Sequence, residues 1–287
     1  MKTYNELFLE TKRRLRGVSG GAHELEARLI IAFASGKTRE ELLNASKYYV
    51  TDAAVLKTVD DMVQRRAKGE PVAYVVGEWE FYGLPMYVSP AVLIPRIDTE
   101  VLAETAIKTL RNNSGHTRVL DLCTGSGCVG IAIAASVPDC RVVLADNSEQ
   151  ALAVCRANMI RNKVTRNTTA IVVDALEAPP ALLGSFDLIV CNPPYIPAED
   201  INDLDCSVRE YEPVAAIDGG SDGLKFYHVI AQKWAVLLNR GGHVLFECGI
   251  GQADDVCEIM SDHGFTDIKT VLDTLGVKRV VSGVVKR

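Results

Sequence analysis

The sequence predicts an α/β protein in which a small helical bundle precedes a mostly parallel sheet with helices on both faces. From about residue 98, apolar strand-like runs alternate with segments of helical periodicity. That alternation is typical of parallel sheets whose two faces are covered. Over residues 1–70, apolar side chains recur every three or four positions, which indicates amphipathic helices.

The elements of the sheet follow in chain order. A helix is expected from Asp98 to Asn112. Five strands are expected at Arg118–Leu122, Arg141–Ala145, Thr169–Val173, Phe186–Cys191 and His243–Glu247. Helices are expected between them and after the last, at Val129–Ser136, Glu149–Arg161, Leu224–Leu238 and Ala253–His263.

Two last strands, Ile268–Leu272 and Arg279–Lys286, are separated by Gly276 and have no helix between them, so they are expected to pair as an antiparallel hairpin. The sheet is then mixed and seven-stranded. A Rossmann-like, doubly wound sheet that ends in such a hairpin resembles the class I S-adenosylmethionine-dependent methyltransferase fold more than a dinucleotide-binding domain.

Composition suggests three segments: a helical domain (1–70), a β-hairpin linker (71–95) and a catalytic domain (96–287). The linker is rich in aromatic residues around Gly77, Gly83 and Pro85. Residues 1–70 contain 13 Lys or Arg and 10 Asp or Glu, a net charge of +3, which leaves −9 for the rest of the −6 chain. An acidic catalytic domain binds phosphate backbones poorly, so no direct nucleic-acid partner is expected.

Hydropathy and cysteine usage predict a cytoplasmic protein, and we expect a monomer. The longest strongly apolar stretches, such as Val129–Val137, are too short to span a bilayer, so no membrane partner is expected. The N-terminus lacks the apolar core of a signal peptide. The eight cysteines include no C-x-x-C pair, and we expect neither disulfides nor a metal.

A glycine-rich loop after the first strand predicts a nucleotide site. Glycines allow close backbone approach, and the following helix N-terminus offers N–H donors. Asp146 ends the next strand, where a carboxylate can accept both ribose hydroxyls. Asp121 can meet the cationic amino group of a methionine moiety but would oppose a pyrophosphate, which favours S-adenosyl-L-methionine over NAD. Asp174 and Ala175 are placed to meet adenine. The predicted donor-binding residues are Asp121, Cys123, Thr124, Gly125, Ser126, Gly127, Asp146, Asp174, Ala175 and Asn192.

The fourth strand ends in Asn192-Pro193-Pro194-Tyr195, which we predict to be the catalytic and substrate-binding turn. Two prolines stiffen it and leave its carbonyls free as acceptors. The Asn192 side-chain oxygen and the Pro193 carbonyl can accept the two N–H bonds of a planar amide or aromatic amine, and Tyr195 can stack on the flat group. The alternative is a structural turn followed by a packed tyrosine.

Motifs along the whole chain resemble those of the HemK/PrmC family of protein-(glutamine-N5) methyltransferases. These are the segment from Gly77 to Gly83, the run Leu93-Ile94-Pro95-Arg96 through Thr99-Glu100, the glycine loop, Asn192–Ile196, and Tyr211-Glu212-Pro213 through Leu224. The family usually has Gly at Cys123 and Pro-Glu at Ile97-Asp98.

The resemblance implies methylation of the glutamine in the Gly-Gly-Gln motif of class-1 peptide chain release factors, with S-adenosyl-L-homocysteine as the second product. It also implies that Phe81 helps form the glutamine pocket and that the helical domain holds the protein substrate. Arg96 and Glu100 either position the linker or donor or form an ordinary salt bridge. The alternatives are a glutamine methyltransferase for a large-subunit ribosomal protein, an amino-adenine DNA methyltransferase, an NAD-dependent oxidoreductase and a non-catalytic binding protein.

Overall fold

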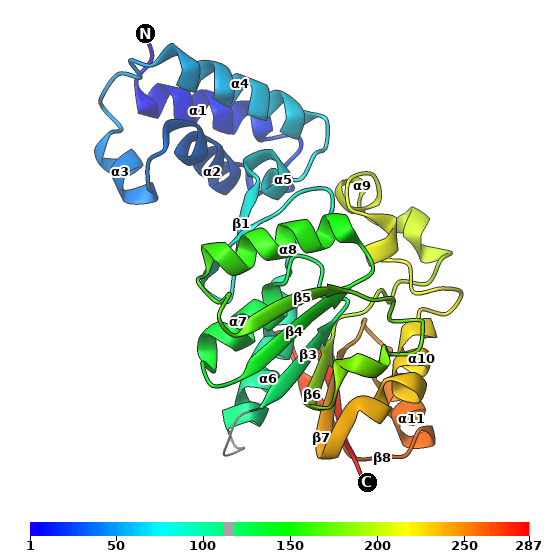
Figure 1. Cartoon of the computed structure of the whole chain (residues 1–287). Coiled ribbons are helices and arrows are strands. Elements are labelled where there is room, and N and C mark those ends of the chain that lie inside the picture. Colours follow the sequence, from blue (N-terminus) through cyan, green and yellow to red (C-terminus); the bar gives the residue numbers. More distant parts are fainter. Residues whose placement is uncertain (112–116, 287) are drawn as a thin grey trace. The chain divides into compact units, whose positions relative to one another are not determined.

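The computed structural model describes residues 1–111 and 117–286 and divides into two compact units (Figure 1). The first comprises Met1–Glu78 together with Asp205–Tyr211, and the second comprises Trp79–Leu204 and Glu212–Arg287. The segment Asp205–Tyr211 belongs to the first unit although it lies within the predicted catalytic range; there the Tyr211 hydroxyl donates to the Lys68 carbonyl at 2.9 Å. The three-part division at residues 70 and 95 remains a prediction.

The first unit is a helical bundle, as its apolar periodicity predicts. Its helices are α1 (Tyr4–Leu15), α2 (His23–Ser35), α3 (Arg39–Asn44), α4 (Ala53–Ala67), α5 (Val72–Val76) and the short α9 (Cys206–Arg209). The Asp52 side chain caps α4 by accepting from the Ala54 N–H at 2.8 Å. Arg66 and Glu26 form a buried ion pair at 2.9 Å.

A two-stranded hairpin begins at the end of the first unit, where the sequence predicts one. Strands β1 (Glu78–Phe81) and β2 (Leu84–Tyr87) are joined by Tyr82 and Gly83, which have φ of 54° and 71°. Two consecutive residues with positive φ are typical of the tight turns that match strand twist. The stretch Val72–Val76 is helical, so only the later part of the predicted linker is β structure.

The second unit is built on the predicted seven-stranded mixed sheet, with the strand order β5-β4-β3-β6-β7-β9-β8. Neighbouring strands from β5 to β7 are parallel, and β9 is antiparallel to both β7 and β8. The strands are β3 (Arg118–Leu122), β4 (Arg141–Asp146), β5 (Thr168–Val172), β6 (Phe186–Cys191), β7 (Leu238–Glu247), β8 (Phe265–Leu272) and β9 (Lys278–Val285). All seven predicted strands are confirmed, and the fold is that of class I methyltransferases.

Helices cover both faces of this sheet (Figure 1). They are α6 (Glu100–Arg111), α7 (Cys128–Ser136), α8 (Glu149–Arg161), α10 (Lys225–Lys233) and α11 (Ala253–Asp262), with 3₁₀ turns at Ile97–Thr99, Ala181–Leu183, Asp200–Asp203, Val214–Ala216 and Ala235–Leu237. Helix α10 ends earlier than predicted because the chain passes into the 3₁₀ turn after Trp234, whose buried ring packs in the core. The predicted end of α6 at Asn112 lies outside the described residues.

Alternate residues of the central strands enter two separate apolar cores. On β6, Leu188 and Val190 pack with α6, α7 and α8, whereas Ile189 and Cys191 pack with α10 and α11. Because successive side chains of a strand point to opposite faces, a continuous apolar strand requires helices on both sides. The two-core arrangement therefore follows from uninterrupted apolar runs such as Leu188–Cys191.

The sheet contains a topological switch point between β3 and β6. From β3 the chain proceeds to β4 and β5 on one side, and then returns to β6 on the other. Leu122 at the end of β3 pairs with Cys191 at the end of β6, so the loop beginning at Cys123 lies beside Asn192. Open α/β sheets bind ligands at the carboxyl edge where the strand order reverses.

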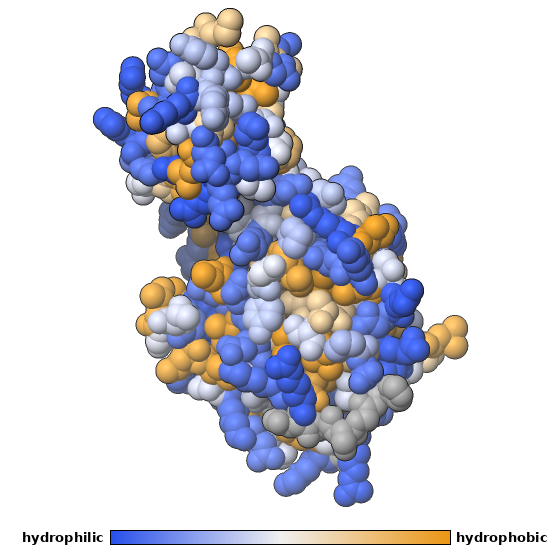
Figure 2. Space-filling view, turned by 90° about the vertical axis from the view of Figure 1, so that its left-hand side faces the viewer, coloured by the Kyte–Doolittle hydropathy of each residue, from blue (hydrophilic) through white to orange (hydrophobic). Residues whose placement is uncertain are grey.

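The surface of the described residues is mixed in polarity. On the face shown in Figure 2, hydrophilic side chains surround separate groups of apolar ones. In the helical unit, Leu25, Phe33 and Leu43 are exposed although they fit its apolar periodicity. Among the described helices, none combines the length and the apolar character needed to cross a membrane.

Candidate active site

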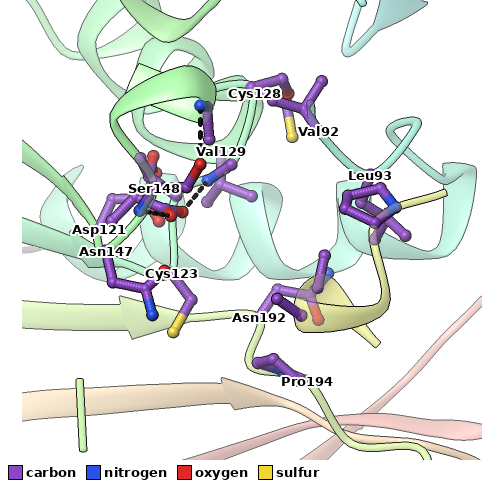
Figure 3. Close-up of a pocket in the computed structure, with 18 of the residues that line it drawn as sticks. Val92, Leu93, Asp121, Cys123, Cys128, Val129, Asn147, Ser148, Asn192 and Pro194 are labelled. Carbon is purple, nitrogen blue, oxygen red and sulfur yellow. Dashed lines mark hydrogen bonds between the residues drawn. The ribbon is translucent and has the colours of Figure 1, made fainter. Parts of the chain in front are cut away.

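A cavity lies at the carboxyl edge of the sheet, in the second unit (Figure 3). Ten predicted site residues line it: Asp121, Cys123, Thr124, Gly125, Ser126, Asp146, Asp174, Ala175, Asn192 and Pro194. In Figure 3, Leu93 lies across the cavity from Asp121 and Ser148, and Asn192 and Pro194 line its lower edge. The switch point thus brings the donor loop and the Asn-Pro-Pro-Tyr turn to one cavity.

The glycine loop folds through three residues in the left-handed region. Cys123, Gly125 and Gly127 have φ of 59°, 54° and 83°. A Cβ at Gly125 would meet nothing within 4 Å, whereas a Cβ at Gly127 would lie 2.7 Å from the Cys155 Sγ. Gly127 does not line the cavity, so its glycine serves the packing of the loop on α8. Cys123, by contrast, adopts a conformation that favours glycine.

Asp121 is buried and holds the loop through one of its oxygens. Its Oδ2 accepts from the Gly130 N–H at 2.9 Å and from the Thr124 hydroxyl at 2.5 Å. A Cβ at Gly130 would lie 2.8 Å from this same oxygen, so only glycine allows the contact. Burial raises the pKa of Asp121 to about 7, against the hydrogen bonds from Thr124 and Gly130, and the nearby Asp146 raises it further.

Asp146 bridges the loop to the start of α8. One oxygen accepts from the Gly125 N–H at 2.8 Å and the other from the Ser148 N–H at 3.0 Å. Burial raises its pKa, whereas these backbone hydrogen bonds lower it. Because Asp146 lines the cavity and its carboxylate oxygens retain further lone pairs, the group fits a ribose diol.

Asp174 and Ala175 line the far side of the cavity, just beyond the end of β5. The Asp174 carboxylate accepts from the Leu176 N–H at 2.9 Å. The buried Trp234 indole N–H donates to the Ala175 carbonyl at 2.9 Å, which anchors this segment to the core. The arrangement fits an adenine ring held between an anchored backbone and an acceptor side chain.

These carboxylates suit S-adenosyl-L-methionine, whose α-ammonium group and sulfonium are cationic. We expect donor binding to weaken as the pH falls through about 7, because Asp121 is then protonated and neutral. Calorimetric titration with S-adenosyl-L-homocysteine between pH 5.5 and 7.5 measures this. In Asp121→Asn the affinity is expected to be lower and the dependence on pH weaker. An unchanged pH dependence in that variant would mean that another group is responsible.

The Asn-Pro-Pro-Tyr turn is held tightly through its backbone. The Gln252 side-chain amide donates to the Tyr195 carbonyl at 2.9 Å, and Ile196 exchanges backbone hydrogen bonds with Ile217 and Gly219. Three glycines approach Tyr195 so closely that an added Cβ would lie 3.1 Å or less from its atoms. They are Gly219, Gly223 and Gly249. The signature Gly219-Gly220-Ser221-Asp222-Gly223 therefore encloses this turn.

Members of the tetrapeptide differ in their exposure to the cavity. Asn192 and Pro194 line it, whereas Pro193 is buried and Tyr195 is half-buried and absent from the lining. The Asn192 Nδ2 donates to the Thr99 hydroxyl at 3.3 Å. Burial raises the pKa of Tyr195, and the neighbouring Glu247 carboxyl acts in the same direction.

Glu247, at the end of β7, is a buried carboxyl that we did not predict as a site residue. Burial raises its pKa to about 7, while hydrogen bonding with the Thr99 hydroxyl, the charge of Arg279 and hydrogen bonding with Tyr195 act in the opposite direction. Its Oε2 is buried without a hydrogen-bond partner among the described residues. The sequence signal was an acidic residue ending an otherwise apolar strand.

The segment before α6 forms one wall of the cavity, through Val92, Leu93, Pro95, Arg96 and Thr99. Arg96 forms an ion pair with the buried Glu212, which also accepts from the Ile94 N–H at 3.3 Å. Glu100 accepts from the Tyr82 N–H at 2.7 Å and so positions the hairpin. Positioning roles for Arg96 and Glu100 were among the predictions. Thr99 was not predicted, because a small hydroxyl residue carries no distinctive pattern.

Phe81 lies away from the cavity lining. Its side chain is 1% exposed and packs in the core with Met86 and Leu102. A direct contact with substrate would require this ring to leave the core, so any role of Phe81 in the pocket remains a prediction.

Among the described residues, no three His, Cys, Asp or Glu side chains are grouped so that they could hold a metal ion. The eight cysteines are free, and five of them are buried. Buried thiols of this kind pack as small hydrophobes.

Fold and site together define the chain as a class I methyltransferase that takes S-adenosyl-L-methionine. Residues 97–204 match the methyltransferase small domain, and residues 6–77 match the PrmC N-terminal domain. A crystal structure of a methyltransferase from Pyrococcus furiosus has the same fold, with a TM-score of 0.51 and 19% identity over 72% of this chain and 91% of its own.

Two relatives show which family of methyltransferases the chain belongs to. A release factor glutamine methyltransferase of Geobacter sulfurreducens is 46% identical over 224 residues, which cover 77% of this chain and 76% of its own. One from Clostridium botulinum is 32% identical over 276 residues, 96% of this chain and 97% of its own. The chain belongs to the family of release factor glutamine methyltransferases.

Proposed function

We propose that this protein transfers a methyl group from S-adenosyl-L-methionine to the side-chain nitrogen of the glutamine in the Gly-Gly-Gln motif of class-1 peptide chain release factors. The observation that carries the proposal is the position of Asn192. Its side chain lines the same cavity as Asp121 and Asp146, so an acceptor for a planar amide lies beside a donor site. We further propose a monomer that binds the release factor through its helical domain and needs neither metal nor nucleic acid.

The donor supplies an electrophilic methyl group on a sulfonium, and the protein supplies alignment. An amide nitrogen is a poor nucleophile because its lone pair is delocalised into the carbonyl. Asn192 Oδ1 and the Pro193 carbonyl, which accepts no hydrogen bond from the described residues, are suited to accept its two N–H bonds. Holding both hydrogens fixes the nitrogen in line with the methyl carbon, which supplies much of the rate enhancement.

The bond changes balance without a strong base. The nitrogen lone pair forms the N–C bond as the C–S bond breaks, and the sulfur keeps the electron pair of the neutral thioether product. The methylated nitrogen is then cationic and loses its proton readily to water. Tyr195 keeps its hydroxyl protonated, since desolvation raises its pKa. Its ring supports the turn and is suited to stacking against the planar amide.

The charge and the relatives favour a release factor over the other substrates. The Geobacter sulfurreducens and Clostridium botulinum relatives are release factor glutamine methyltransferases, not methyltransferases of a ribosomal protein. An amino-adenine DNA methyltransferase would need basic groups to bind phosphates. The segment between Ile196 and Leu224 instead carries an excess of acidic residues. The alternatives of NAD-dependent oxidation and of binding without catalysis find no support in a family of methyltransferases.

The test is transfer of radiolabelled methyl groups to purified class-1 release factors by the full-length protein. We expect one methyl group per factor, located on the glutamine by mass spectrometry. Replacing that glutamine by alanine in the release factor is expected to abolish labelling. Label that persists after this replacement would remove the glutamine assignment, and transfer to a purified ribosomal protein instead would favour that alternative.

A further inference from the structure

The Asn192 amide must present its oxygen, not its nitrogen, to a substrate that offers N–H groups. The two ends of an asparagine amide have nearly the same size and shape, so packing alone selects between them poorly. In the structure Nδ2 donates to the Thr99 hydroxyl at 3.3 Å, which leaves Oδ1 as the free end. The orientation therefore depends on whether Thr99 acts as an acceptor at this contact.

Thr99 is placed to contact both Asn192 and a carboxyl group. It ends the short 3₁₀ turn Ile97–Thr99, is 2% exposed, and lines the cavity. Its hydroxyl lies close enough to the carboxyl of Glu247, itself 2% exposed, to lower the pKa of that carboxyl. Phe246 of β7 pairs with Cys191 of β6. The next residues along the two segments, Glu247 and Asn192, are therefore neighbours.

A hydroxyl has one proton, and this fixes the direction of the chain of hydrogen bonds. Above its raised pKa of about 7, Glu247 is an ionised carboxylate that can only accept, so the Thr99 hydroxyl directs its proton toward Glu247 and its lone pairs remain for the Asn192 N–H. A flipped Asn192 would place Oδ1 against an oxygen whose proton is already engaged. Two acceptors would then face each other in a buried position, which is strongly unfavourable.

Other groups hold Glu247 in place. Tyr195 and Arg279 lie near enough to its carboxyl to lower its pKa, and the Tyr227 hydroxyl donates to its backbone carbonyl at 2.9 Å. Arg279 is in turn fixed by Asp273 and by the Cys248 carbonyl at 3.1 Å. Burying the Oε2 atom of Glu247 without a hydrogen-bond partner costs free energy, and packing alone does not explain why a carboxyl is present there.

We infer that Thr99 and Glu247 are positioning residues, which orient the Asn192 amide so that its oxygen faces the amide to be methylated. This inference rests on the proposed function, because the oxygen-inward orientation matters only for a substrate that donates N–H bonds. It predicts that the two residues affect the chemical step and not the affinity for the donor.

Thr99→Val tests the inference because it keeps the shape of the side chain and removes the hydroxyl. At pH 8.5 with saturating donor and release factor, we expect kcat to fall about 10–100-fold, the size of effect that misplacing a reacting group produces. The Kd for S-adenosyl-L-homocysteine is expected to stay within about twofold, and Thr99→Ser is expected to restore most of the activity.

Glu247→Gln provides the second arm, because a neutral amide can donate to Thr99 as well as accept from it. We expect kcat to fall in this variant too. In the double variant the two effects are expected to be far from additive, since both act through the same hydrogen-bond chain. Fully additive effects would overturn the chain.

A matched control is Thr168→Val, which removes another buried threonine hydroxyl of the same unit, bonded to the Val164 carbonyl at 2.8 Å. It is expected to lose stability without loss of kcat. If Thr99→Val keeps the wild-type kcat, or if Thr99→Ser fails to restore it, the inference is wrong. If the wild-type protein itself transfers no methyl group to the glutamine, it is the proposed function that fails.

Discussion

Replacing Asn192 by Ala is expected to lower the rate of methyl transfer by about three orders of magnitude while the protein still binds its donor. The side chain lines the cavity and supplies an acceptor that no neighbour replaces within the described lining. Loss of one preorganised group at the reacting centre commonly costs this much, because the substrate nitrogen then keeps its resonance and its freedom to rotate.

Two measurements check this prediction. Single-turnover transfer to a release factor gives the rate, and calorimetry with S-adenosyl-L-homocysteine gives donor affinity. Asn167→Ala is the matched control, since it removes an asparagine that donates to the Ala134 carbonyl at 3.1 Å in the same unit but outside the cavity lining. A rate for Asn192→Ala within about tenfold of the wild type would contradict the proposed mechanism.

Replacing Gly223 by Ala is expected to reduce both stability and activity, through the backbone of the Asn-Pro-Pro-Tyr turn. The added Cβ would lie 2.3 Å from the Tyr195 carbonyl oxygen and 2.6 Å from the Gln252 side-chain nitrogen, at a φ of +75°. Either the turn moves or the loop does, and a shift of about 1 Å in a positioning group costs roughly 10²-fold in rate.

Backbone strain alone can be separated from this collision. Gly241 has a φ of +76°, but a Cβ there would meet nothing within 4 Å. Gly241→Ala is therefore expected to lower the free energy of unfolding by about 1–2 kcal/mol, the cost of the left-handed conformation for a side chain, and to keep its activity. Thermal unfolding and methyl transfer should be measured for both variants. Equal losses in the two would mean that the contact with Tyr195 is unimportant.

The local pattern of apolar residues is a strong signal for secondary structure, and it was sufficient to predict the strands of the sheet. Runs such as Leu188–Cys191 are too short for typical helices and are apolar throughout, which predicts strands buried on both faces. Errors occurred where local signals compete: Val72–Val76 is rich in β-branched residues yet forms a helix, and α10 ends at Lys233 because the buried Trp234 redirects the chain.

The candidate site was predicted in part for the same reason. Acidic residues at strand ends and glycines before a helix are visible locally, and Asp121, Asp146 and Asp174 all line the cavity. Gly127 and Tyr195 do not line the cavity. Their roles are in packing, and these depend on neighbours that are far away in the sequence. Phe81 packs in a core that no local pattern around this residue indicates.

The sequence by itself determined which residues follow or end three strands: a glycine loop after β3, the acidic Asp146 at the end of β4, and the Asn-Pro-Pro-Tyr turn after β6. Each depends on residues that are close together in the chain. Only the tertiary structure placed Thr99 and Glu247 beside Asn192, from segments 93 residues before it and 55 residues after it along the chain. Hydrogen bonds between such distant segments depend on how the strands pair across the sheet, which residue periodicity does not encode.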